Sequence, residues 1–308
     1  MDLPYFFGQR PIYIPAGFKY LNRAAEKNES IQKAILGMGT IIDGHPAMAE
    51  AMNEDGLACA GLNFAGYAFF SENQDEEKEN IAPYDFILWA LSRHKNVDEV
   101  KSSVAGIHFV SVPINEKTEV SQLHWMLCDR SGKSIVVEAT ERGISCYDNP
   151  VGVMTNNPEF PWHLTNLREY LKVSADNPAN TDWSELQLSP LGVGAGTLGM
   201  PGDFSSVSRF VRAAFARANL PNDIKPGEEV GQFFHMLDYC AMVKGGVLTA
   251  DGICDYTTYS SCMDLERGIY YYKNYGNNRI NAVRLNKCTG SKLISFPYTE
   301  KQDINFLN

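Results

Sequence analysis

Three polar residues stand where strand and helix propensities would not place them. Asn63 ends the apolar segment GLACAGLN, and Asn156 ends the segment VGVMTN. An amide at the end of a strand can cap a turn, or it can donate N–H bonds to a developing oxyanion. Arg209 lies in the apolar helical pattern SSVSRFVRAAF. It is either a surface residue with a buried stem, or a buried cation that needs a carboxylate or a ligand.

Other chemistry-bearing residue types show no motif with the required spacing. The six histidines lack a metal-site spacing such as HExxH, and we expect His124, in an apolar strand pattern, to be a core residue with satisfied hydrogen bonds. The seven cysteines include no CxxC pair, which favours reduced thiols over a disulfide or zinc framework. The GxGxxG match at Gly194–Gly199 lies between two prolines instead of between a strand and a helix, so we interpret it as a surface loop. A Cys/His pair is neither supported nor excluded, and we expect no metal and no cofactor.

Composition limits the class of protein and its partners. The chain has 308 residues, of which 44% are hydrophobic and 21% charged, as in an ordinary globular protein. It has no apolar run long enough to span a bilayer and no signal-peptide pattern at its first residues, so we expect a cytoplasmic protein without a membrane partner. The formal net charge of −10 argues against nucleic acid as a partner, and an acidic ligand would need local donors.

The hydrophobic pattern predicts helices between two groups of antiparallel strands. Residues 31–70 alternate apolar segments with glycines, as short buried strands do, and the acidic stretch 71–80 is expected to be a solvated loop. From residue 83 a helical period predicts either a helix pair or one bent helix. We expect a four-stranded meander at 123–129, 134–140, 144–149 and 151–156, a loop-rich stretch at 157–203 with a short helix near 162–171, helices at 205–219 and 228–243, and strands at 257–265, 268–275 and 280–286. Because the chain shows no linker and no repeat, we expect residues 1–308 to form one α+β domain.

Several long segments together carry a resemblance to a known family. They are LGMGTIIDG, MNEDGLACAGLNF, LHWMLCD, GVMTNNPEFPWHLTNL, GVGAGTLGMPGDFSSVSRFVRA and TTYSSCMDLERGIYYY. From Met1 almost to its end, the chain resembles the choloylglycine hydrolase family, and within it the bile salt hydrolases more than the penicillin V acylases. The resemblance implies the N-terminal nucleophile hydrolase fold, a four-layer αββα arrangement with two stacked antiparallel sheets. It also implies release of glycine or taurine from conjugated bile salts, and a homo-oligomer, commonly a tetramer.

The resemblance implies a role for five residues of the site. Asp2 matches the carboxylate that orients the amine and thiol of an N-terminal cysteine, and Arg209 matches the arginine that favours its thiolate. Asn156 matches the side-chain oxyanion donor, and Asn63 matches the residue whose backbone N–H is the second donor. Met1 matches a residue at the rim of the apolar substrate pocket. Asn63, where a tyrosine would favour penicillin V, favours bile salts.

The nucleophile of the family is missing from the 308 residues. In the family, a cysteine-led strand runs into a segment RNMD, and Met1-Asp2 resemble the end of that segment, followed by an aromatic-rich stretch typical of the middle of a domain. We therefore expect a chain that is truncated at its N-terminus, essentially inactive as written, and unstable because a sheet edge is left open. The alternatives are an acylase for penicillin V or N-acyl homoserine lactones, or a non-catalytic binding relative.

Overall fold

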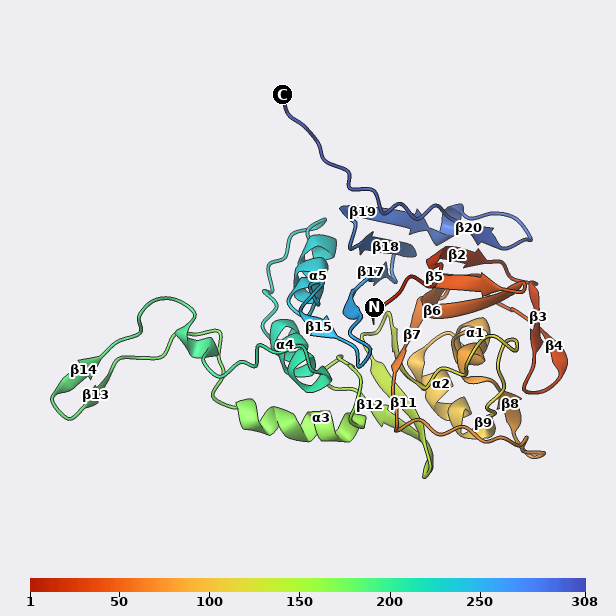
Figure 1. Ribbon diagram of the computed structural model, residues 1–308, viewed down its shortest axis with the longest axis horizontal. Coiled ribbons are helices and arrows are strands. Elements are labelled where there is room, and N and C mark those ends of the chain that lie inside the picture. The colour runs from red at the N-terminus through yellow and green to blue at the C-terminus, as the bar shows by residue number, and fades with distance from the viewer.

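The structure, a computed structural model, describes all 308 residues and is built around an eight-stranded antiparallel sheet (Figure 1). Its strands, in spatial order, are β12 (Gly143–Asp148), β11 (Ser134–Thr140), β10 (Leu123–Asp129), β7 (Leu57–Asn63), β6 (His45–Asn53), β5 (Ile35–Ile42), β2 (Arg10–Ile14) and β20 (Ile294–Ser295). The turn between β5 and β6 is Asp43-Gly44, with φ of 49° and 80°. Both positions need positive φ in the tight hairpin turn that matches strand twist, which explains the Asp-Gly pair.

A second antiparallel sheet stacks on the first. It consists of β17 (Tyr259–Asp264), β18 (Ile269–Asn274) and β19 (Asn277–Arg284), with β17 at one edge. A smaller sheet of β1 (Asp2–Leu3), β16 (Cys254–Thr257) and β15 (Val247–Leu248) continues beside β17. Apolar and aromatic side chains fill the space between the stacked sheets: Tyr13, Leu36, Met38 and Met52 from the first, and Tyr259, Tyr270 and Tyr272 from the second.

Helices form the two outer layers. Helices α1 (Phe86–Arg93) and α2 (Val97–Ser103) pack on the first sheet over the largest core, in which Trp125 is fully buried (Figure 1). On the other side lie α3 (Phe160–Asn166), α4 (Ser206–Ala218) and α5 (Glu229–Asp238). Phe160 and Phe210 of α3 and α4 pack against Val136 of β11. The resulting αββα layers are the N-terminal nucleophile hydrolase fold that the resemblance implied.

The remaining elements are short. They are the hairpins β3 (Lys19–Asn22) with β4 (Lys27–Ser30) and β13 (Thr181–Trp183) with β14 (Leu186–Leu188), the parallel pair β8 (Glu79–Ile81) and β9 (Ile107–Phe109), and five 3-10 turns, η1 (Pro83–Asp85), η2 (Val104–Gly106), η3 (Leu167–Tyr170), η4 (Ala195–Thr197) and η5 (Leu285–Lys287). The β13–β14 hairpin projects far from the body of the molecule (Figure 1). Gly194–Gly199 lies in the same loop-rich stretch, with no strand leading into it, as expected.

Two predictions about local structure are wrong. The fourth meander strand, 151–156, does not exist: residues 149–159 have no regular structure, because Val153 is buried against α3 and α4 instead of pairing in the sheet. Helix α5 ends at Asp238, five residues before the predicted end. The acidic stretch 71–80 is a mostly exposed connection, as expected, and only its last two residues enter β8, where Glu79 binds Arg93 at 2.6 Å. The choice between a helix pair and one bent helix at 83–104 resolves as the pair α1 and α2.

Candidate active site

Four residues from four distant parts of the chain are joined in one series of hydrogen bonds. Arg209 donates from Nη1 to Oδ2 of Asp2 at 3.2 Å and from Nη2 to Oδ1 of Asn156 at 2.8 Å. Asn156 in turn donates from Nδ2 to the backbone carbonyl of Asn63 at 2.8 Å. The structure therefore brings together Asp2, Asn63, Asn156 and Arg209, the residues that sequence analysis singled out.

Asp2 is held from both sides of its carboxylate. Strand β1 pairs with β16 so that Asp2 lies opposite Thr257, whose hydroxyl donates to Oδ1 of Asp2 at 2.5 Å. The same hydroxyl accepts from the backbone N–H of Met242 at 2.8 Å. With Arg209 on the other oxygen, the carboxylate cannot rotate without losing a bond. Thr257 is a site residue that sequence analysis missed, and the only signal for it was its place in the TTYSS run.

Arg209 reaches the site because of how helix α4 begins. Ser205 caps the helix and accepts from the N–H of Ser208, as predicted for this serine. Arg209 on the first turns then donates from Nε to the carbonyl of Phe204 at 3.1 Å, and its side chain is only 12% exposed. It is thus the buried cation with a carboxylate partner, not the surface alternative. Ser205 and Ser208 also donate to Asp203 just before the helix, which lowers the pKa of Asp203 to about 2.

Asn156 is fixed by its backbone as well as by its side chain. Its N–H donates to Oγ of Ser206 at 2.8 Å, and its carbonyl accepts from Nε2 of His163 at 3.1 Å. The preceding carbonyl, of Thr155, accepts from Nε2 of His124 at 2.8 Å. His124 is buried and hydrogen-bonded, as its apolar strand pattern predicts. The roles of Ser206 and His163 were not predicted, since nothing local in the sequence relates either residue to Asn156.

Asn63 and Met1 lie at the outer end of the cluster and at the sheet edge, respectively. Asn63 is the last residue of β7, paired with Leu123 of β10, and is exposed to solvent. Met1 is partly buried and packs against the side chains between the two sheets. Its carbonyl accepts from the N–H of Thr258 at 2.9 Å, and its amine donates to the carbonyl of Tyr259 at 2.9 Å. The chain thus runs antiparallel to the start of β17 at this point.

The cysteines of the chain lie apart from the Asp2 carboxylate. All seven are free, and none hydrogen-bonds to the side chains of Asp2 or Asn156. The thiol of Cys240 donates to the backbone carbonyl of Arg209 at 3.6 Å, not to a side chain of the cluster. Burial raises the pKa of Cys240, of Cys128 to about 11 and of Cys262 to about 12, which keeps these thiols protonated at neutral pH. No group of three or more His, Cys, Asp or Glu side chains is arranged to hold a metal ion.

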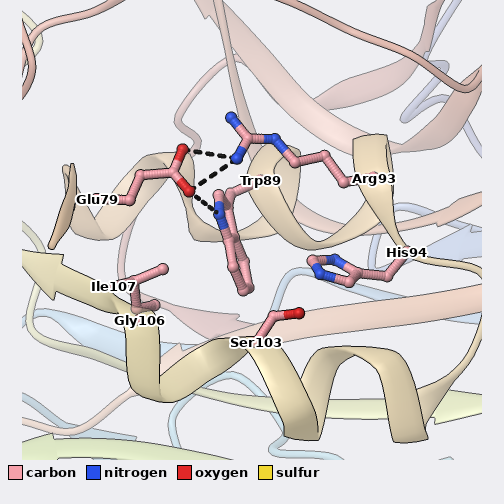
Figure 2. Close-up of a pocket in the computed structure, with 7 residues that line it drawn as sticks. All are labelled: Glu79, Trp89, Arg93, His94, Ser103, Gly106 and Ile107. Carbon is pink, nitrogen blue, oxygen red and sulfur yellow. Dashed lines mark hydrogen bonds and ion pairs between the residues drawn. The ribbon is translucent and has the colours of Figure 1, made fainter.

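A cavity of about 260 Å³ lies elsewhere, between α1, α2 and the start of β9 (Figure 2). Arg93 and the indole N–H of Trp89 bind the Glu79 carboxylate there, at 2.6 and 3.0 Å. The charges of Arg93 and Glu79 neutralise each other, and the contacts of Glu79 hold β8 against α1. The cavity shares no residue with the Asp2 cluster, so we assign the candidate active site to the cluster and not to the cavity.

The fold and this cluster agree with a match to a family model. Residues 1–292 match the model of the linear amide C–N hydrolases, choloylglycine hydrolase family. The chain belongs to this family of amide hydrolases. No helix of the structure combines the length and the apolar character that crossing a membrane requires.

Characterised relatives are similar over nearly the whole chain. The bile salt hydrolase/transferase of Clostridium perfringens is 42% identical, with 100% of this chain and 94% of that protein covered. The bile salt hydrolase/transferase of Lactiplantibacillus plantarum is 42% identical over 86% of this chain and 82% of its own. A crystal structure of a cysteine-to-alanine mutant of the Clostridium perfringens conjugated bile acid hydrolase has a TM-score of 0.95 at 43% identity, covering 100% of this chain and 94% of that one. Penicillin V acylase from Agrobacterium tumefaciens shares the fold, with a TM-score of 0.73 at 19% identity over 93% of this chain and 81% of its own.

Proposed function

We propose that the protein hydrolyses the amide bond of conjugated bile salts and releases glycine or taurine. The observation that carries the proposal is the series of contacts from Asp2 through Arg209 and Asn156 to Asn63. It sets the side-chain amide of Asn156, on an irregular segment, next to a partly buried carboxylate–guanidinium pair. Such a donor is suited to the oxyanion of a tetrahedral intermediate. Nδ2 of Asn156 donates to the Asn63 carbonyl, and a substrate oxyanion would replace that carbonyl.

The proposed reaction needs a thiolate and a base at the position that Asp2 and Arg209 surround. A cysteine on a strand preceding Met1, paired with the edge strand β17, would supply both groups. Its α-amine, with a reference pKa of about 7.7–8.0, would take the thiol proton and pass it to the departing amine of glycine or taurine. The thiolate forms a thioester as the C–N bond breaks, and water then hydrolyses the thioester. Asp2 would orient the amine, and Arg209 would favour the thiolate.

Exposed apolar side chains and the net charge of the chain bear on the kind of substrate and agree with a steroid amide. Exposed aromatic side chains follow both Asp2 and Asn63 in the chain: Tyr5, Phe6, Tyr67 and Phe69 are 59, 50, 40 and 51% exposed. Together with Met1, they offer apolar contact for a sterol body. The net charge of −10 gives no long-range attraction to an anionic substrate, so local donors must hold its acidic group. The names of the relatives support bile salts as the substrate class.

The test compares two proteins, the 308-residue chain and the same chain preceded by its natural upstream residues. Because no cysteine of the chain binds Asp2 or Asn156, we expect taurine release from taurocholate only from the longer protein. In that protein, Asn156→Ala should lower kcat by about 100-fold to 1000-fold with little change in KM, as loss of an oxyanion donor does. Asn286→Ala, on the exposed surface, is the matched control. Upstream DNA without an in-frame cysteine, or equal activity of both proteins, would contradict the proposal.

Assays on the same two proteins distinguish two other functions from bile salt hydrolysis. An acylase for penicillin V or N-acyl homoserine lactones would hydrolyse one of these substrates and leave taurocholate intact. A binding relative would fold as the 308-residue chain, unfold cooperatively and bind taurocholate without releasing taurine. Bile salts remain the preferred substrate, because Asn63 stands where a tyrosine would favour penicillin V.

We further propose a cytoplasmic homo-oligomer. The segment around the projecting β13–β14 hairpin exposes large apolar side chains: Leu171, Trp183, Leu186, Leu191, Val193 and Leu198. A single chain leaves them in water, and a second copy would cover them. Sedimentation of the wild type against Trp183→Ser tests this, since a monomeric wild type would contradict it. A tetramer is the expected assembly.

A further inference from the structure

Residues 149–159 carry Asn156 but belong to no strand or helix, so other groups must satisfy their backbone. Around Asn156, three side chains do so. Ser206 accepts from the N–H of Asn156 at 2.8 Å, His163 donates to the Asn156 carbonyl at 3.1 Å, and His124 donates to the Thr155 carbonyl at 2.8 Å. Two successive carbonyls at the candidate oxyanion donor are therefore each held by a histidine.

The two histidines come from different layers and are immobilised by stacking. His124 lies on β10 and is 1% exposed, with its ring 4.3 Å from that of Phe64 at an interplanar angle of 5°. His163 lies on α3 and is 2% exposed, with its ring 4.6 Å from that of Phe210 at 18°. Neither imidazole hydrogen-bonds to the side chain of Asp2, Asn156 or Arg209, and each binds the segment around Asn156 through a backbone carbonyl.

The partners determine which ring nitrogens carry hydrogen. A backbone carbonyl only accepts, so Nε2 must be protonated in both rings. In His163, Nδ1 has no partner, and burial lowers the pKa, so the ring is a neutral single donor. In His124, Nδ1 faces Oε1 of the buried Glu138 at 3.2 Å, and this oxygen also accepts the N–H of Phe160 at 3.0 Å. Glu138 thus fixes the ring of His124 and the start of α3 together.

We propose that His124 and His163 are positioning residues for amide hydrolysis, which hold the peptide on either side of Asn156 so that its side-chain amide stays aimed at the oxyanion. This inference rests on the oxyanion role of Asn156 given above. An irregular segment would otherwise let the amide drift, and displacement of a catalytic group by about 1 Å can cost on the order of 100-fold in rate. The histidines replace the ladder bonds that a strand would have provided.

The kinetic test uses the longer protein of the proposed function, with two substitutions at each histidine. Methionine removes the donor at similar volume, whereas glutamine keeps an N–H donor on a side chain of similar reach. We expect His163→Met and His124→Met to lower kcat by about 10-fold to 100-fold with KM within about twofold. We expect the glutamine variants to recover most of that loss. His235→Met, at an exposed position on α5, is the control.

A purely structural role would give a different pattern. If the methionine variants lose thermal stability but keep kcat per folded molecule, or if glutamine rescues no better than methionine, the inference is overturned. Folded fraction is measured by thermal unfolding of each variant, so that loss of folded protein is not taken for loss of turnover.

A second measurement does not depend on turnover. In the 15N-labelled 308-residue chain, NMR should show both imidazoles protonated at Nε2, and the Asn156 side-chain amide signals should shift or broaden in His163→Met but not in His235→Met. An Nδ1-protonated His163, or an unchanged Asn156 amide, would overturn the inference. If the longer protein hydrolyses no amide while these NMR results hold, the proposed function fails and the positioning of Asn156 stands.

Discussion

The guanidinium of Arg209 lies 3.2 Å from the carboxylate of Asp2, although the two residues are 207 positions apart in the chain. Asp2 reaches this place because β1 pairs with β16, and Arg209 reaches it from the first turns of α4. The side chains are 21% and 12% exposed. Removing either partner therefore leaves the other charge unpaired where water reaches it poorly. We expect single substitutions of Asp2 or Arg209 to be destabilising for this reason.

Arg209→Met should destabilise the fold and the site together. With the guanidinium gone, Asp2 and Oδ1 of Asn156 lose a donor, and we expect a loss of about 2 kcal/mol, between the values for exposed and fully buried pairs. Arg209→Lys should recover part of it, because one ammonium cannot bond Asp2, Asn156 and the Phe204 carbonyl in the same fork geometry. Urea unfolding of the 308-residue chain measures both variants.

The exposed Arg168 offers the control for this substitution. Arg168→Met should leave the unfolding midpoint within experimental error. Equal stability of wild type and Arg209→Met would show that the contacts of Arg209 with Asp2 and Asn156 contribute nothing to stability. This outcome would contradict the prediction.

Much of the fold could be predicted from the sequence because its strands and helices have clear periods. The strands β5, β6 and β7 and the helix α4 with its Ser205 cap follow directly from local pattern. The segment 151–156 misled the prediction because its apolar residues match a strand, yet Val153 is buried under helices instead. Local sequence cannot distinguish these two ways of burying an apolar side chain.

Some residues of the candidate site could be predicted from the sequence and others could not. Asn63 and Arg209 were found because each is polar within an apolar pattern, and Asp2 was found only through the family resemblance. Thr257 and His163 could not be found, since their roles depend on contacts with residues far away in the chain: the Thr257 hydroxyl binds Asp2, and His163 binds the Asn156 carbonyl.

Thr257→Val should release the Asp2 carboxylate at nearly constant shape. The Thr257 hydroxyl donates to Oδ1 of Asp2 at 2.5 Å and accepts from the Met242 N–H, so valine removes the partner of that oxygen and of that N–H. We expect a loss of stability of about 1–3 kcal/mol. Thr257→Ser keeps the hydroxyl and should lose clearly less. The comparison is made by thermal unfolding at pH 7, and a valine variant as stable as the serine variant would contradict the prediction.

Asp203→Asn should destabilise the protein at neutral pH and have no effect in strong acid. Hydrogen bonds from Ser205 and Ser208 lower the pKa of folded Asp203 to about 2, below the value near 3.9 of an unfolded chain. The folded state thus binds fewer protons, and the contribution is fully present above about pH 4 and is lost as the pH falls towards 2. Tm measured from pH 2 to 7 should show the two proteins converging at the acid end, whereas a constant difference would count against the prediction. Asp251→Asn, at an exposed position, should follow the wild type throughout.

Glu50 should make the fold less stable as the pH rises. Its carboxylate is buried between the sheets and accepts from the hydroxyls of Tyr259, Tyr270 and Ser261 at 2.7, 2.5 and 3.0 Å. Burial raises its pKa in spite of these bonds. The unfolded chain therefore loses its proton first, near pH 4.3, and stability falls from there up to the pKa of the folded state.

Glu50→Gln removes this titration, so the Tm of the variant relative to wild type should rise between pH 4 and pH 8. Whether the Tm of Glu50→Gln lies above or below that of wild type at pH 4 depends on how well the three hydroxyls accommodate the amide. The change of this Tm difference with pH does not depend on it. Glu116→Gln, at an exposed position, should show no such trend. If the difference between Glu50→Gln and wild type is the same at both ends of the range, the three hydroxyls compensate the burial fully. The carboxylate would then be as acidic between the sheets as it is in water.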